Sequence, residues 1–244
     1  MSQIENTLSG QEYHYIKDPT SLTKFLKTML WISLGINLLS LLFDNMQMTL
    51  LSAGSFSQAQ DESNEARRQI VALLYLGAFI VTGITFLKWI YRANLNCHGF
   101  GAQGMKFSPG WSIGYYFIPL LNLYLPYEAM KEIWKVSRNP SDWQNEMGSP
   151  LLGWWWALWL ISNFLAYLLF RMSMKAYTIS SVQDSTIVSI YLGSYLQDST
   201  TVSIYLGVIN IPLYLVAISL VSAVFARQEN LVKSTFNKTP HGGK

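Results

Sequence analysis

The side chains best suited to chemistry lie between Lys88 and Arg138, in the middle of the 244-residue chain. Cys97 and His98 are neighbours there, but a thiol beside an imidazole holds no metal unless further ligands follow at a suitable spacing. Cys97 is the only cysteine, and the other two of the three histidines lie near the chain ends. The sequence therefore predicts no metal site, no cofactor and no catalytic residue.

Gly99, Gly101 and Gly104 follow with the G-x-G-x-x-G spacing of a dinucleotide-binding loop. That loop needs a strand before it and a helix after it. Here the preceding residues form a long apolar run, so we interpret the glycines as a flexible turn.

The same region carries groups that can bind a lipid phosphate or a protein surface. A guanidinium near the C-terminal end of a helix, where we place Arg92, is favoured by the helix dipole and can bind phosphate. The residues that we predict to bind lipid or a partner are Trp89, Arg92, Asn96, Trp111, Asn122, Glu132 and Trp134.

Long apolar runs must position these groups. The chain is 50% hydrophobic and 13% charged, whereas a soluble domain carries about 25% charged residues. Its formal net charge of +3 is spread along the chain, which does not indicate nucleic-acid binding. A membrane span needs roughly 20 mostly apolar residues. The predicted spans are residues 25–43, 70–90, 151–170 and 201–225.

Residues 111–127, WSIGYYFIPLLNLYLPY, are also uncharged, but Pro119 would remove a helix hydrogen bond near their middle. If this segment re-enters the membrane or lies at its interface, thirteen of the 17 Lys and Arg residues fall on one side. If it crosses the membrane, these residues divide almost evenly between the two sides. The positive-inside rule therefore favours a re-entrant or interfacial segment, shaped by Pro119 and Pro126, with both chain termini in the cytoplasm.

Residues 127–138 have the pattern of a short amphipathic helix. Tyr127, Met130, Ile133 and Trp134 fall on one face, and charged residues occupy the other. This pattern predicts a helix that lies on the cytoplasmic membrane surface. A helix packed on the loops of its own protein would have the same pattern, and that alternative stays open.

The four predicted spans contain no Asp, Glu or His. Ion-coupled transport usually needs buried ionisable groups, and intramembrane proteolysis needs its own catalytic groups, so the sequence predicts no enzyme. Three of the spans each carry one asparagine, whose amide is expected to bond between helices. These predicted structural residues are Asn37, Asn163 and Asn210.

Polar stretches join the spans. We expect a flexible loop at 44–69, a Ser- and Thr-rich connector at 171–200, and polar tails at 1–24 and 227–244. Within the second connector, residues 183–193 recur at 197–207 with a single difference, which indicates a local tandem duplication. An inserted copy keeps nearly the same helix face, because fourteen residues make about 3.9 turns. Its β-branched residues also permit a short pair of strands.

The central region resembles domain-of-unknown-function family 4328, a group of uncharacterised bacterial membrane proteins. The resemblance covers roughly residues 25–230 and is most specific over Phe86–Ser137. It implies a multi-pass protein of the bacterial cytoplasmic (inner) membrane, and it brings no activity. The positions that match the family pattern are Trp89, Arg92, Asn96, Ser108, Pro109, Trp111, Pro119, Asn122, Leu123, Pro126, Glu132 and Trp134, with Gln228 similar to the family's ending.

The sequence thus predicts an all-α integral membrane protein. It has four transmembrane helices in a membrane domain at 25–226, a re-entrant or interfacial aromatic and proline segment, and a short amphipathic surface helix. The predicted role is a non-catalytic scaffold or binding module whose partners are the bilayer, anionic lipid, another protein or a second copy of the chain. The alternative is a protein for transport or permeation of small molecules or lipids, in which residues 111–127 line the path.

Overall fold

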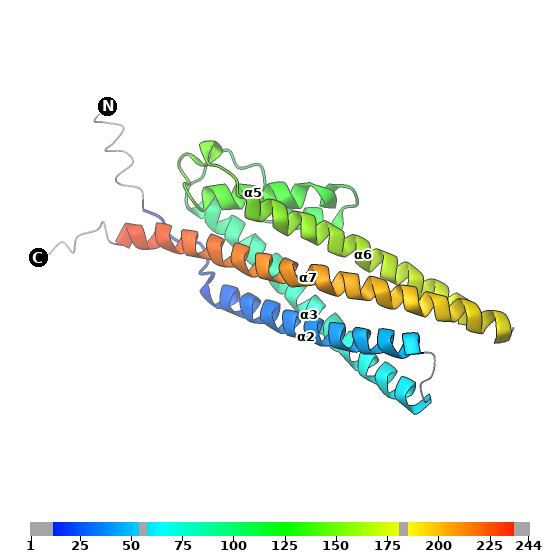
Figure 1. Cartoon of the computed structure of the whole chain (residues 1–244). Helices are drawn as coiled ribbons and strands as arrows, with labels where there is room; N and C mark the ends of the chain where they lie inside the picture. The colour runs from blue at the N-terminus through cyan, green and yellow to red at the C-terminus, as the bar shows by residue number, and fades with distance from the viewer. Residues whose placement is uncertain (1–11, 54–57, 181–184, 237–244) are drawn as a thin grey trace, which may run out of the picture. The chain divides into compact units, whose positions relative to one another are not determined.

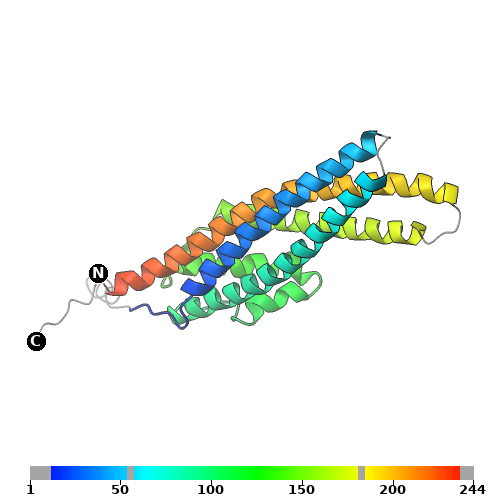
Figure 2. The same cartoon turned by 90° about the horizontal axis from the view of Figure 1, so that it is seen from below.

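The computed structural model describes residues 12–53, 58–180 and 185–236, and no strand occurs in that part of the chain. Long helices make up most of the described chain, and short helical turns lie between α3 (Gln58–Gly99) and α6 (Pro150–Ser180) (Figures 1 and 2). This arrangement confirms the predicted all-α fold. The elements are α2 (Thr20–Ala53), α3 (Gln58–Gly99), α4 (Trp111–Gly114), η1 (Tyr115–Phe117), η2 (Leu121–Leu123), α5 (Leu125–Val136), η3 (Trp143–Asn145), α6 (Pro150–Ser180) and α7 (Ser185–Phe236).

Four of the described helices are long and apolar enough to cross a membrane, as predicted. Their candidate spans are Thr20–Ser52, Ala66–Gly99, Pro150–Ala176 and Tyr195–Thr235. Each helix extends beyond its predicted apolar run at both ends. Hydropathy marks only the apolar part of a helix. The backbone hydrogen bonds of the helix continue into the polar residues at its two ends.

The predicted loop at 44–69 is wrong over most of its length. α2 continues to Ala53, and α3 already begins at Gln58. Hydroxyl side chains at the end of α2 bond back to their own helix, as Thr49 does to the carbonyl of Asn45 at 2.9 Å. Ser52 does the same to the carbonyl of Met48 at 2.8 Å. Polar side chains that satisfy themselves in this way do not end a helix.

The connector and strand pair predicted after residue 170 are also wrong in the described residues. α6 continues to Ser180, and α7 runs from Ser185 through the second duplicated copy to Phe236. Residues 183 and 184 of the first copy lie outside the described residues. The helix also contains Pro212 and extends ten residues into the predicted C-terminal tail at 227–244.

The chain divides into two compact units, and each long helix contributes to both. Unit 1 comprises residues up to Thr28, Gly83–Gly153 and the chain from Ile218 onward, and unit 2 comprises Met29–Thr82 and Trp154–Ala217. In unit 1, α4, η1, η2 and η3 pack against α5. The largest fully buried side chains of unit 1 include Leu26, Trp89, Ile90, Phe100, Met130, Ile133, Leu152 and Leu220.

Unit 2 is held by hydrogen bonds between its long helices. The Asn37 side chain on α2 donates to the carbonyl of Gly207 on α7 at 2.9 Å. Asn210, also on α7, accepts from Ser162 on α6 at 2.7 Å and donates to the hydroxyl of Tyr75 on α3 at 3.1 Å. Asn37 and Asn210 thus each bond to a neighbouring helix in this structure.

Gly207 lets α2 and α7 approach closely. A Cβ atom there would lie 2.6 Å from Cδ2 of Leu41, which is too close for two carbon atoms. At Gly77 on α3, by contrast, a Cβ atom would meet nothing within 4 Å.

We expect Gly207→Ala to lower the free energy of unfolding by about 1–3 kcal/mol relative to Gly77→Ala, because the added methyl group overpacks the contact with Leu41. Both changes gain about 1 kcal/mol of helix propensity, so their difference isolates the contact. Circular dichroism during SDS titration of the protein in micelles measures it. Equal midpoints for the two variants would contradict the close approach.

Candidate functional site

The candidate site is built around α5 in unit 1. Pro126 lies in the first turn of this helix, where its missing N–H costs nothing, and Glu128 follows in the same turn. Lys135 lies in the last turn, so both charges complement the helix dipole. The apolar face of α5 is buried within the protein, with Met130 and Ile133 almost fully covered. This agrees with the alternative in which the helix packs on its own protein.

Glu132 is buried and fixes the loop that follows α3. Its carboxylate accepts the backbone N–H of Lys106 at 2.7 Å and that of Phe107 at 3.1 Å. Burial removes water from the carboxylate and raises its pKa, although the two backbone hydrogen bonds oppose that shift. The predicted binding residue Glu132 therefore positions the loop in this structure.

Asn94 and His98 hold the same loop from the other side. The Asn94 amide donates to the carbonyl of Phe107 at 3.2 Å, and Nε2 of His98 lies 3.2 Å from the same oxygen. The backbone of Phe107 is thus tied to both α3 and α5. The glycine-rich stretch before it turns sharply, with positive φ angles at Gly101 and Gly104, which agrees with its interpretation as a turn.

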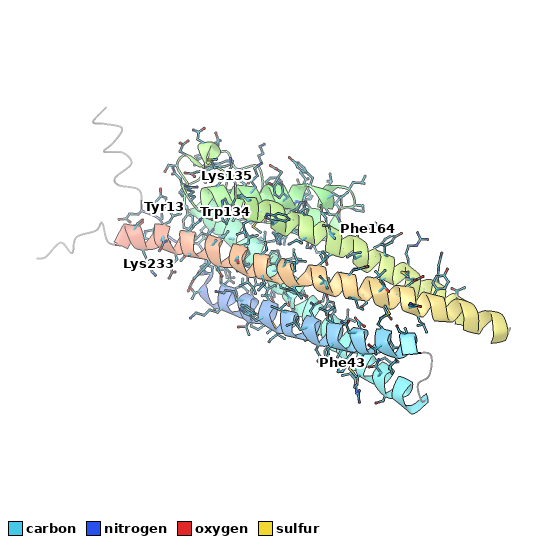
Figure 3. The ribbon with its side chains drawn as sticks, in the orientation of Figure 1. Tyr13, Phe43, Trp134, Lys135, Phe164 and Lys233 are labelled. Atoms are coloured by element: carbon cyan, nitrogen blue, oxygen red, sulfur yellow. The ribbon has the colours of Figure 1, made fainter. Side chains whose placement is uncertain are left out.

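A cavity of about 370 Å³ lies between this loop and α5. Its charged lining consists of Lys106, Lys131, Lys135, Glu128 and Glu132. Glu132 is engaged by the two backbone amides, and Glu128 pairs with Lys131 at 3.3 Å. The side chain of Lys135, labelled in Figure 3, donates to a backbone carbonyl, that of Gln144, at 3.3 Å. The lining therefore has three lysines against two glutamates, a formal excess of one positive charge. We call this cavity the α5 site.

Residues 111–124 form an exposed apolar segment beside the α5 site. The exposed fractions are 72% for Phe117, 79% for Leu120 and 59% for Tyr124. Pro119 separates two short helical turns, and Leu120 has a φ of 68°, so the segment is not one continuous helix. Its position relative to a membrane stays a prediction.

Aromatic contacts join the apolar segment to the α5 site. The ring of Phe107, which lines the cavity, meets the ring of Tyr115 edge-on at 5.9 Å between centroids. Tyr115 in turn stacks on Trp111 at 5.1 Å. The predicted site residue Trp111 is thus linked to the cavity lining through Tyr115, but it does not line the cavity itself. Asn122 is half-buried in η2, and its backbone N–H donates to the carbonyl of Ile118 at 3.0 Å.

Two other predicted binding residues anchor the N-terminal segment. Asn96 is fully buried, accepts the backbone N–H of Lys17 at 3.1 Å and donates to its carbonyl at 3.0 Å. Arg92 donates to the carbonyl of Asp18 at 2.9 Å. Gly99 makes room for the same segment, because a Cβ atom there would lie 2.5 Å from Cγ1 of Ile16. Asn96 and Arg92 therefore serve the fold, and neither lines the α5 site.

The predicted binding residues Trp89 and Trp134 are also buried. The indole of Trp89 donates to the Thr23 hydroxyl at 3.1 Å, which ties α3 to α2. The guanidinium of Arg227 on α7 lies 3.6 Å from the ring centroid of Trp134, as a cation–π pair. Sequence reasoning missed this pair, because the two residues are far apart in the sequence and no local pattern indicates that they are in contact.

Gln228 is a further residue whose role only the structure reveals. It is buried, and its amide donates to the carbonyl of Ala93 and to the hydroxyl of Ser137, both at 3.1 Å. It thereby links α7, α3 and the end of α5. Its only signal in the sequence was its similarity to the family's ending.

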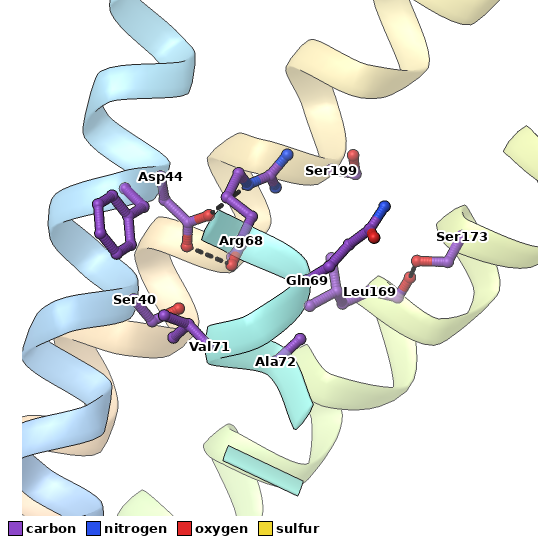
Figure 4. Close-up of a pocket in the computed structure, with 11 residues that line it drawn as sticks. Ser40, Asp44, Arg68, Gln69, Val71, Ala72, Leu169, Ser173 and Ser199 are labelled. Atoms are coloured by element: carbon purple, nitrogen blue, oxygen red, sulfur yellow. Dashed lines mark hydrogen bonds and ion pairs between the residues drawn. The ribbon is translucent and has the colours of Figure 1, made fainter. Parts of the chain in front are cut away.

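A second polar cavity, of about 270 Å³, lies in unit 2 (Figure 4). Asp44 at its wall is only 4% exposed, accepts from the hydroxyl of Ser203 at 2.7 Å and pairs with Arg68 at 3.3 Å. Sequence reasoning missed it because the predicted span stopped at residue 43, one residue short, whereas the candidate span continues to Ser52. The polar lining residues are Ser40, Asp44, Arg68, Gln69, Ser173, Ser199 and Ser203.

Asn163 differs from the other two span asparagines. It is exposed on α6, and its amide donates to the carbonyl of Trp159 in the same helix at 2.7 Å. The predicted interhelical bond of Asn163 is therefore not formed within the described chain.

Comparison with known proteins agrees with the resemblance. The family model described as "Domain of unknown function (DUF4328)" matches residues 54–226, which is more than half of the chain. No curated protein matches, and no solved structure matches.

We expect Glu132→Ala to speed hydrogen–deuterium exchange at Lys106 and Phe107 by about 10- to 100-fold, because it leaves two backbone amides without an acceptor. Mass spectrometry of peptides that cover residues 100–110 measures the change. Glu128→Ala is the control, since Glu128 lines the same cavity and bonds to Lys131 instead of the loop. Unchanged exchange in the Glu132 variant would show that the carboxylate does not hold the loop.

Proposed function

The chain belongs to the family Domain of unknown function (DUF4328), which assigns it no activity, and we propose from its structure that it is a non-catalytic membrane module that binds anionic lipid. The ligand group is the phosphate of the lipid headgroup, and the binding place is the α5 site. The observation that carries the proposal is a cavity lined by three lysines and two glutamates, whose Phe107 ring contacts an exposed apolar segment through Tyr115.

The charges of the α5 site support this function. Three lysines face two carboxylates, and each oxygen of the Glu132 carboxylate already accepts a backbone N–H. An ammonium group near an anionic membrane surface contributes about 1 kcal/mol to binding. A lipid phosphate in the cavity would replace the weak contact between Lys135 and the Gln144 carbonyl by a charge-assisted one.

The apolar segment supplies the second part of a membrane contact. Phe117, Leu120 and Tyr124 are more than half exposed, and burying such side chains in the headgroup and acyl region removes them from water. Basic residues beside exposed apolar side chains are the usual combination in proteins that bind at the membrane interface. The proposal places residues 111–124 at the membrane interface, as a re-entrant or interfacial segment. It places both termini in the cytoplasm, on the side that carries most of the Lys and Arg residues.

The test compares lipid binding of the full chain and its lysine variants in nanodiscs. We expect the natural protein to retain anionic phosphatidylglycerol over phosphatidylcholine in native mass spectrometry. Lys131→Gln with Lys135→Gln is expected to weaken that preference by about 10- to 30-fold, because two ammonium groups are lost.

Lys233→Gln is the matched control for this test. Lys233, labelled in Figure 3, is an exposed lysine of unit 1 that pairs with Glu229 and does not line the α5 site. Equal retention of both lipids by the natural protein, or equal effects of the two sets of variants, would refute the proposal.

A second candidate function is permeation of a small polar solute through unit 2. The cavity beside Asp44 favours it, because all four long helices contribute to a polar lining among candidate spans. The Asp44–Arg68 pair adds no net charge to this lining, so it suits an uncharged solute such as glycerol. Polar and ionisable groups within a span are often functional.

Stopped-flow light scattering of proteoliposomes tests this second candidate. We expect glycerol to enter at least about tenfold faster than into empty liposomes, and Ser199→Phe to abolish the gain by filling the cavity. Ser52→Phe, at the exposed end of α2 and outside the cavity lining, is the control. Equal rates with and without protein would exclude this candidate and leave the lipid-binding proposal untouched.

A further inference from the structure

The exposed amide of Asn163 is out of place on a candidate membrane span. Its side chain bonds only to the Trp159 carbonyl of its own helix among the contacts of the described chain. An amide has two N–H donors and a carbonyl acceptor. Most of this hydrogen-bonding capacity would face hydrocarbon, where nothing can satisfy it.

The residues that share this side of α6 repeat at a regular interval. Tyr167, Phe170 and Met174 follow Asn163 at steps of four, three and four residues, and their exposed fractions are 54%, 60% and 50%. A four-three step keeps side chains on the seam of a left-handed helix pair. None of the residues in the most apolar stretch of α6 is buried within the described chain, so this face is available to another helix.

We propose that α6 pairs with α6 of a second copy of this chain through Asn163, Tyr167, Phe170 and Met174. The inference is independent of the lipid and solute proposals, because none of these side chains lines either cavity.

A second copy is the occupant that the amide itself favours. Two helices related by a two-fold axis bring the same residue of each copy together. Because Asn163 carries donors and an acceptor, the two amides satisfy each other, whereas a lipid chain satisfies neither. A single asparagine on an apolar seam also fixes the register of the pair.

Cysteine cross-linking of the full chain in native membranes tests the pairing. Phe170→Cys and Tyr167→Cys keep Asn163 and place a thiol on the seam, and we expect each to form a disulfide-linked dimer under mild oxidation. Ile161→Cys and Phe164→Cys are the controls, since these exposed residues lie on another side of α6 (Phe164 is labelled in Figure 3). The parent protein has only the buried Cys97 and is expected to stay monomeric on the gel.

Asn163→Leu then tests the amide directly. In the Phe170→Cys background we expect it to lower the dimer yield, and energy transfer between labelled copies in liposomes should show association about 3- to 30-fold weaker. No hydrogen bond of Asn163 to another helix is formed within the described residues, so we expect the fold to survive this change. Cross-links at Ile161→Cys as strong as at Phe170→Cys, a monomer at all positions, or a cross-link to a different protein would overturn the proposal.

Discussion

Buried polar groups need partners inside the protein, and this constraint shapes most of the structure. Water can hydrogen-bond an amide or a carboxylate at a surface. In a chain that is half hydrophobic, the interior excludes water, so these groups need hydrogen-bond partners from the protein. Glu132, Asn96 and Gln228 each meet the constraint with two or more hydrogen bonds. Removing one partner would leave the other unsatisfied, which costs more than the bond itself contributes.

The same constraint explains why most predicted binding residues became part of the fold. Unusual polar and aromatic residues in an apolar chain indicate either a site or a buried contact, and the sequence does not distinguish the two. Trp89 and Asn96 are buried contacts. The lysines of the α5 site and the apolar segment before α5 remain accessible, so the proposed function rests on a largely different set of residues than the pattern suggested.

The repeated sequence at 197–207 lies in a helix, and a helix tolerates an added stretch of this length. The second copy lies wholly within α7, where Ser199 and Ser203 line the cavity beside Asp44 and Gly207 accepts the Asn37 amide. Fourteen residues make nearly four full turns, so adding a copy rotates the following helix only slightly. The contacts beyond the duplication therefore need little adjustment, whereas in a pair of strands every added residue would shift the pairing register.

The sequence by itself determined the all-α class, the four apolar spans, the proline break at residue 119 and the family. These are local properties, because an apolar run or a proline acts within one helix. Only the tertiary structure decided where the helices end, which face of α5 is covered, and which asparagines bond between helices. Asn37 and Gly207 are 170 residues apart, and Tyr13 and Thr235 are 222 apart. Asn163 and Asn37 both lie in apolar stretches of sequence, but Asn163 is exposed, whereas Asn37 donates to the carbonyl of Gly207. The partner of a side chain depends on tertiary packing, which no local pattern contains.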